Sequence, residues 1–141
     1  MAYRCGVHML IDFSGLILND MSPIYLQIIR FVKVKIALGE AESGDELPSR
    51  RMLSVILNVN PNTIQKCCRI MENEGFLQSQ AGAKSLLNFD TEMAAQMKRQ
   101  LCVEETERFV NEMKRLKLEK DQIIELIGSY WQQGENDDEI K

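Results

Sequence analysis

Two helix start signals stand close together near the centre of the chain and restrict what it can fold into. Pro48 disfavours helix at the residue before it, and Ser49 can cap a helix that begins directly afterwards. Asn60 followed by Pro61 forms a second pair of N-cap and first helical residue. Only residues 58–60 separate the two helical patterns, and so short a turn forces the helices to cross steeply. The central segment is therefore predicted to form two crossed helices.

The same segment is a basic island in an acidic chain. From Leu47 to Met71 there are four cationic side chains and no Asp or Glu, whereas the whole chain has a net charge of −4. Residues 1–22, 23–89 and 90–141 carry net charges of −1, +2 and −5. Cations that only solvate a helix face are usually interspersed with acids, so this segregation predicts that the middle of the chain contacts a polyanion.

Further patterns flank the central helices. Ser22 and Pro23 can start an earlier helix, and Gly39 supplies its stop after apolar residues have recurred at helical spacing. After the central helices, two short segments of alternating polarity, 76–80 and 85–89, surround a turn of small residues. Three helices followed by a hairpin is the order of a winged helix-turn-helix.

The predicted fold class is mainly α with a small β-hairpin, a winged helix-turn-helix followed by a C-terminal helical dimerisation segment. We expect the winged helix-turn-helix to occupy residues 23–89. Residues 1–22 are expected to form an N-terminal arm or a short strand, residues 90–133 a two-helix dimerisation domain, and residues 134–141 an acidic tail.

The apolar residues of the two central helices predict one buried face on each. These residues are Met52, Leu53, Ile56 and Leu57 on the first helix, and Ile64, Cys67, Cys68 and Met71 on the second. The four cysteines of the chain include no Cys-x-x-Cys pair, so we expect reduced thiols that act as small apolar groups. Oxidant sensing by one thiol of the adjacent pair is the alternative.

A long apolar stripe follows from residue 90. Asp90 or Thr91 can cap a helix of about 40 Å at 1.5 Å per residue, and Glu119 and Asp121 favour the start of another. A helix that long cannot bury its stripe on a hairpin alone, which predicts a dimer interface. Its residues are Met97, Leu101, Phe109, Met113, Leu116, Ile123, Ile127, Tyr130 and Trp131. The alternative is a pocket between the subunits for a small-molecule effector, lined by Met97, Phe109, Met113, Tyr130 and Trp131.

Composition and motif content exclude several classes of protein. No apolar run reaches the roughly 18 residues of a membrane span, and residues 1–18 lack the cleavage site of an export signal, so a cytoplasmic protein is expected. His8 is the only histidine, and there is no catalytic triad, Gly-rich phosphate loop or metal-ligand spacing. We therefore expect neither an enzyme nor a bound metal or cofactor.

Short motifs are spread in order through the middle of the chain. They comprise Pro23, Ile24, Tyr25, Gln27, Ile28, Gly44, Asp45, Leu47, Pro48, Ser49, Arg51, Asn60, Pro61, Asn62, Thr63, Arg69, Glu72, Glu74 and Gly75. Together they resemble the GntR-type bacterial transcription regulators, and specifically the short YtrA-like branch of that family. Several spaced motifs in the correct order are more specific than any one alone.

The resemblance implies a sequence-specific, homodimeric DNA-binding regulator that acts as a repressor on a pseudo-palindromic operator. In this family the arginine at the position of Arg51 contacts the operator, as does the first turn of the recognition helix, here Asn60, Asn62, Thr63 and Gln65. The hairpin reaches the minor groove, and the short branch dimerises through its two C-terminal helices.

The chemistry of these residues suits that assignment. Arg51 can donate a bidentate pair to guanine, and Asn62 and Gln65 can pair with adenine, although both could also be ordinary exposed helix residues. The helix N-termini offer free N–H groups to phosphate. The full set of candidate DNA contacts is Ser49, Arg50, Arg51, Asn60, Asn62, Thr63, Gln65, Lys66, Arg69, Gly82 and Lys84.

The expected wing departs from the family pattern. Residues 80–84 contain one cation, Lys84, where the family usually has several, so anchoring in the minor groove is expected to be weak. A poor wing on an acidic chain also suits a winged-helix protein-protein interaction module, which is the alternative function.

Overall fold

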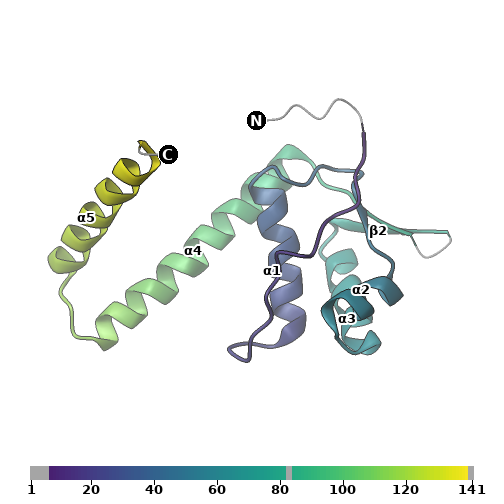
Figure 1. The fold of residues 1–141 in the computed structure, drawn as a ribbon, viewed down its shortest axis with the longest axis horizontal. Coiled ribbons are helices and arrows are strands. Elements are labelled where there is room, and N and C mark those ends of the chain that lie inside the picture. The colour runs from purple at the N-terminus through teal and green to yellow at the C-terminus, as the bar shows by residue number, and fades with distance from the viewer. Residues whose placement is uncertain (1–6, 82–83, 140–141) are drawn as a thin grey trace. The chain divides into compact units, whose positions relative to one another are not determined.

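The computed structural model describes residues 7–81 and 84–139. The elements within them are, in order, α1 (Ile24–Ala37), β1 (Glu46–Leu47), α2 (Arg50–Leu57), α3 (Pro61–Asn73), β2 (Leu77–Gln80), β3 (Lys84–Leu87), α4 (Thr91–Arg115) and α5 (Lys120–Glu139) (Figure 1). This order confirms the predicted fold class of a winged helix-turn-helix followed by a C-terminal helical segment. The chain divides into two compact units between Gln100 and Leu101, inside α4. None of the helices in the described ranges combines the length and the apolar character needed to cross a membrane.

The first helix starts one residue later than predicted. Its N-cap is Pro23 rather than Ser22, and no side chain caps it. The Gln27 side chain instead joins the preceding loop to the first turn: its Nε2 donates to the Asn19 and Ser22 carbonyls at 2.8 and 2.7 Å. The predicted stop is confirmed, since Gly39 follows the helix with a φ of +73°, a conformation that glycine adopts without strain.

The hairpin belongs to a three-stranded antiparallel sheet in the order β1-β3-β2. Strand β1, which pairs Glu46 with Leu86 and Leu47 with Ser85, was not predicted. Two residues are too few to show an alternating pattern, and pairing with β3 is what makes this segment a strand.

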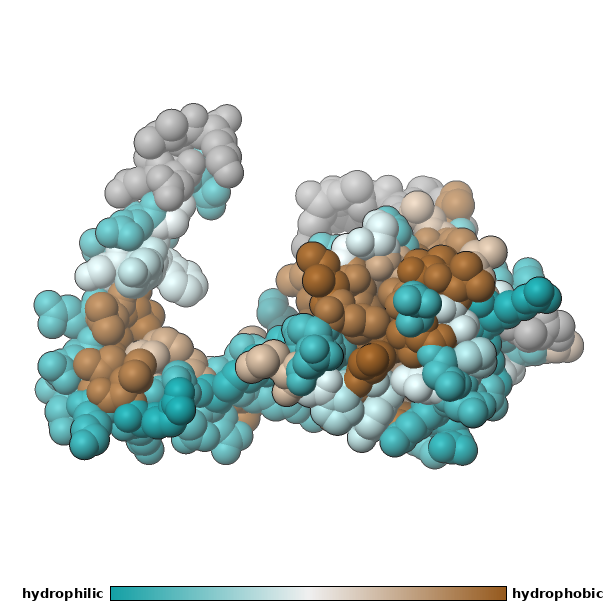
Figure 2. All heavy atoms as spheres, turned by 60° about the horizontal axis from the view of Figure 1, so that its bottom comes forward, coloured by the Kyte–Doolittle hydropathy of each residue, from teal (hydrophilic) through white to brown (hydrophobic). Residues whose placement is uncertain are grey.

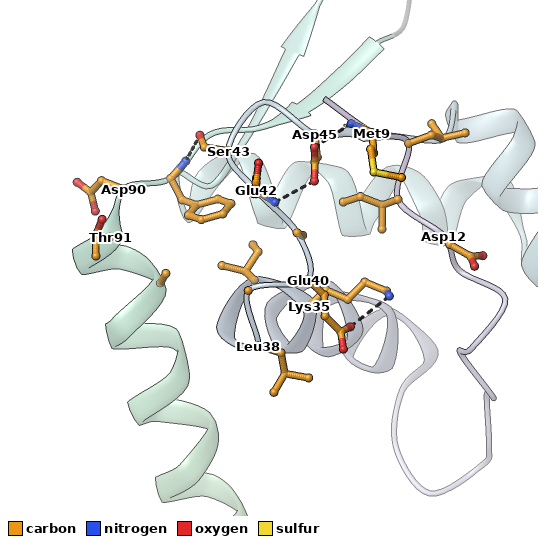
Figure 3. A pocket seen from close by; sticks show the side chains of 17 residues that line it. Met9, Asp12, Lys35, Leu38, Glu40, Glu42, Ser43, Asp45, Asp90 and Thr91 are labelled. Carbon is orange, nitrogen blue, oxygen red and sulfur yellow. Dashed lines mark hydrogen bonds and ion pairs between the residues drawn. The ribbon is translucent and has the colours of Figure 1, made fainter. Parts of the chain in front are cut away.

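The N-terminal segment packs against this sheet. Leu10 forms an isolated parallel bridge to Glu46, and the Ile11 N–H donates to the Glu46 carbonyl at 2.8 Å. Figure 3 shows the loop beside it, where the Asp45 carboxylate accepts from the Met9 and Glu42 N–H groups, both at 2.9 Å. Ile11 and Phe13 are buried in the core of the first unit, so this part of the expected arm contributes to its packing.

Helix α3 is the centre of the first unit. It packs against α1, α2 and β2 (Figure 1). Its buried residues are Ile64, Cys67, Cys68 and Met71, as predicted. The prediction for α2 is wrong in part: Leu53 is buried, but Met52 and Ile56 are both 50% exposed. An eight-residue helix packs one row of side chains inward, and that row is Leu53 and Leu57, while the neighbouring row is rotated by about 100° toward solvent.

The C-terminal helices begin where the sequence predicts. Asp90 Oδ1 accepts from the Met93 N–H at 2.8 Å and so caps α4, which ends before Lys117 at a φ of +62°. Helix α5 runs to Glu139, through most of the segment expected to be an acidic tail. Gly134 does not stop it, because glycine inside a helix costs only about 1 kcal/mol relative to alanine.

Candidate nucleic-acid interface

Helices α2 and α3 each begin at an exposed cap. Ser49 Oγ accepts from the Met52 N–H at 3.1 Å, and Asn60 Oδ1 accepts from the Asn62 N–H at 2.8 Å, which confirms both predicted N-caps. Neither first turn contains an acidic residue. The remaining N–H groups of the two turns therefore favour an anion such as phosphate.

The turn between these helices is held by the chain itself. Asn58 ends α2 in the left-handed conformation, with a φ of +51°. The Ser54 hydroxyl donates to the Val59 carbonyl at 2.6 Å, and the Val59 N–H donates back to the Ser54 carbonyl at 3.1 Å. Val59 itself is buried. These contacts fix the crossing of α2 over α3, so the two N-termini keep their relative positions.

Burial of one side of α3 leaves a polar side facing solvent. Its exposed residues include Asn62, Gln65, Lys66 and Arg69, and Thr63 is partly buried. The amides of Asn62 and Gln65 lie within the first two turns, as the sequence predicts for a recognition helix. Side chains at this end of a helix are the ones that reach base edges in a major groove.

Arg50 is bound within the unit instead of projecting freely. Its Nη1 donates to Gln65 Oε1 at 2.5 Å, and its Nη2 lies 3.3 Å from Glu72 Oε1 and 3.4 Å from Ser79 Oγ. The Ser79 hydroxyl also donates to Glu72 Oε1. One guanidinium therefore connects the start of α2, the length of α3 and strand β2.

Lys66 is also occupied. Its Nζ lies 3.8 Å from the centre of the Tyr25 ring, over the ring of a residue in α1. A cation on an aromatic face contributes about 0.5 to 2 kcal/mol, depending on exposure. The contact of Lys66 with Tyr25 thus stabilises the packing of α3 against α1. A count of charges along the sequence does not detect this role.

Arg51 and Arg69 are the cations of the basic island that remain available. Both are exposed, and within the described residues neither has an ion pair or a side-chain hydrogen bond. On the wing, Lys84 is exposed and lies 4.0 Å from the Glu46 carboxylate, which offsets part of its charge. Gly82, the predicted contact at the wing tip, lies outside the described residues.

The paired cysteines are inside the unit. Burial raises the pKa of Cys67 to about 12, and the thiol donates to the Tyr25 carbonyl at 3.6 Å. Burial also raises the pKa of Cys68, although the neighbouring Arg50 guanidinium acts in the opposite direction. Thiols that keep their protons at neutral pH suit the core role and not oxidant sensing.

The residues predicted at a dimer interface fall into three groups. Met97 is buried in the core of the first unit, which removes it from the expected interface and from the expected effector pocket. Ile123 is buried in the second unit, and Leu101 and Met113 are partly buried. The exposed members are Phe109, Leu116, Ile127, Tyr130 and Trp131. Three further apolar residues of this unit, Val103, Ile124 and Leu126, are also exposed.

An apolar groove of about 700 Å³ lies between α4 and α5 within the second unit. Apolar side chains gather there in Figure 2, at the left. Its lining includes the apolar residues Phe109, Val110, Leu118, Ile123, Ile124 and Ile127, and the charged residues Lys114, Lys117, Glu119 and Lys120. The lysines were not singled out from the sequence, because residues 90–141 carry a net charge of −5 and a count along the chain does not show that three lysines meet at one groove.

A steep helix pair with acid-free first turns, attached to a small antiparallel wing, defines a winged helix-turn-helix protein. No protein-family model matches the chain. The helix-turn-helix transcriptional regulator YhcF of Bacillus subtilis is 35% identical over 116 residues, which is 82% of this chain and 96% of that protein. The B. subtilis transcriptional repressor YtrA is 39% identical over 64 residues, which is 45% of this chain and 49% of YtrA.

A solved structure agrees with these relatives. The GntR family transcriptional regulator from Listeria monocytogenes superposes with a TM-score of 0.69 at 32% identity, covering 79% of this chain and 98% of that one. The chain belongs to the GntR family of helix-turn-helix transcriptional regulators, and the resemblance to its YtrA-like members is confirmed. Members of this family regulate transcription and are not enzymes, so the chain is not an enzyme.

Proposed function

We propose that the chain binds a pseudo-palindromic DNA operator in the cytoplasm as a homodimer and represses transcription. The observation that carries this proposal is the exposed polar side of α3, with Asn62 and Gln65 near its start and Arg69 further along, beside the unpaired Arg51 of α2. Donors of this kind recognise base edges and phosphates. The relative YtrA is named a transcriptional repressor, which supports the direction of regulation.

Each contact has a chemical role in this proposal. Arg51 donates a bidentate pair to a guanine, Asn62 pairs with a base edge, and Arg69 neutralises a phosphate. Ser49, Asn60 and Thr63 place the helix N-termini against the backbone. Arg50 and Lys66 were candidate contacts in the sequence, and we assign them instead to positioning, since Gln65, Glu72 and Tyr25 already bind them.

The second unit supports the homodimer. Tyr130 and Trp131 are 72% and 70% exposed, and contiguous apolar surface of this kind marks an interaction site. The acidic second half of α5, which includes Glu135 and Asp138, is complementary in charge to the three lysines that line the groove. We therefore propose that the groove is covered by a second copy of the chain, without an effector.

Binding to DNA is tested by titrating duplexes at several salt concentrations. Enrichment from a random duplex pool yields the operator, and wild-type affinity should then fall steeply between about 50 and 200 mM salt as phosphate contacts release counterions. Arg51→Ala should lower specific affinity about 30-fold or more, because the dimer loses one contact of about 1 to 3 kcal/mol with a base in each of two half-sites. Arg99→Ala, which removes an exposed cation of α4, is the matched control and should keep near wild-type specificity.

One result would contradict the role of Arg51, and another would refute the proposed DNA binding as a whole. Wild-type affinity for the enriched duplex in Arg51→Ala would exclude Arg51 as a base contact. A wild-type chain that binds no duplex even at low salt would favour the protein-protein interaction module instead, since that function needs no phosphate contacts.

A further inference from the structure

The contact between Arg50 and Gln65 restricts how Gln65 can bind a base. Arg50 Nη1 lies 2.5 Å from Gln65 Oε1. A guanidinium has five N–H donors and no acceptor, so the atom that faces it must be the amide oxygen. The usual ambiguity between the oxygen and the nitrogen of a glutamine amide is therefore removed at this position.

The position of Arg50 is itself fixed by the fold. Gln65 and Glu72 lie on one side of α3, and Arg50 reaches both, with its Nη2 3.3 Å from the Glu72 carboxylate. Arg50 and Glu72 are only 35% and 32% exposed, and Ser79 of the neighbouring strand contacts both. A charge-assisted contact that is partly shielded from water and held by three elements keeps the guanidinium in place.

This arrangement leaves Gln65 with donors. Its oxygen is engaged by Arg50, so the exposed side chain offers the two N–H groups of its amide. Paired recognition of adenine needs both a donor to N7 and an acceptor for the N6 amino group. The free lone pair of the oxygen lies beside a positive guanidinium, which repels that amino group. Guanine presents only acceptors, N7 and O6, at the same edge.

We infer that Gln65 recognises the operator as a hydrogen-bond donor oriented by Arg50, and that it favours the acceptor edge of guanine over adenine. Arg50 is a positioning residue in this mechanism, because it acts on the base through Gln65. The inference rests on the proposed DNA binding, and it replaces the adenine pairing that the residue type alone suggests for Gln65.

The test uses the full chain and the duplex that it enriches. Comparison of wild type with Gln65→Ala over all single-base variants of that duplex identifies the position whose preference depends on Gln65. Wild type should favour guanine over adenine there by about 5- to 20-fold. Replacing this guanine with 7-deazaguanine, which lacks the N7 acceptor, should weaken wild type several-fold and leave Gln65→Ala unchanged.

A second variant tests the role of Arg50. Arg50→Met keeps the length of the side chain but removes its donors, so the amide is free to rotate and the guanine preference should fall to within about 2-fold. Arg99→Met, which removes an exposed cation from α4, is the matched control and should keep the wild-type preference. Far-UV circular dichroism reports whether each variant is folded, and the 7-deazaguanine comparison needs no Arg50 variant.

Three outcomes overturn the inference while leaving DNA binding intact. They are a wild-type preference for adenine at the Gln65-dependent position, an unchanged guanine preference in a folded Arg50→Met, and no position that depends on Gln65. A wild-type chain that enriches no duplex would overturn the proposed function and this inference together.

Discussion

At the scale of single residues, burial decides the chemistry of the two adjacent thiols in α3. Cys67 and Cys68 are each 1% exposed, and the raised pKa of Cys67, about 12 against an ordinary value of 9.0, keeps its thiolate scarce at neutral pH. Cys102 is exposed on α4. Because the thiolate is the nucleophile, the two kinds of site should react very differently.

Alkylation of the native protein measures this difference. Iodoacetamide at a pH near 8 should label Cys102 and leave Cys67 and Cys68 unmodified, as followed by peptide mass spectrometry. The unfolded chain should be labelled at all four of its cysteines, including Cys67 and Cys68. Since the thiol pKa is raised in the folded state, protection should weaken only as the pH rises well above the ordinary value of 9.0. Labelling of native Cys67 at the rate of Cys102 would contradict the core role.

Two neighbouring arginines show how far residue types predict the interface. Arg50 and Arg51 look equivalent in the sequence, and both were expected to contact DNA. Only the fold distinguishes them, because the partner of Arg50 is Glu72, 22 residues away on another helix. The caps at Ser49 and Asn60 were predictable, since they depend on hydrogen bonds to residues two or three positions further along. Contacts between elements require the tertiary structure.

At the scale of elements, Asp45 joins the N-terminal segment to the winged unit. It is 1% exposed, and its two carboxylate oxygens accept from the backbone N–H groups of Met9 and Glu42. Helix periodicity predicted α1, α3 and α4 from local patterns. The same method missed β1 and the packing of residues 9–13, because both depend on pairing between distant segments.

Asp45→Asn should destabilise the first unit by about 1 to 3 kcal/mol, because an amide nitrogen replaces one acceptor oxygen of a buried side chain and a partly buried N–H group loses its partner. The matched control is Asp12→Asn, an exposed carboxylate that accepts hydrogen bonds from nearby Ser14, and it should leave the stability near the wild-type value. Urea unfolding followed by circular dichroism measures both values. Equal stability of the two variants would mean that the contacts of Asp45 contribute little.

At the scale of the whole molecule, each unit has a separate task in the proposed mechanism. The first unit holds α2 and α3 at a fixed crossing, and the second exposes the apolar side chains of Phe109, Ile127 and Trp131. The sequence predicted the apolar stripe of the second unit, but it could not separate Met97, which faces a core, from residues that face solvent. In the proposed homodimer, the first units of the two copies are linked. Such a pair should bind an operator far more tightly than one copy, because the second half-site contact is then intramolecular.

The central claim is that a homodimer, joined through its second unit, binds both half-sites of one operator. The affinity of an interface variant for DNA duplexes tests this claim most directly. Wild type should bind the enriched palindromic duplex about 100-fold or more tightly than a duplex with one half-site. The double variant with Ile127→Asp and Trp131→Asp should sediment as a monomer, and it should bind both duplexes with the lower affinity. The control Ser129→Asp lies on the opposite side of α5 and should behave as wild type. A double variant that stays dimeric and keeps the tight binding would contradict this account. So would a wild type that binds the two duplexes equally well, because a homodimer that contacts both half-sites must prefer the palindromic duplex.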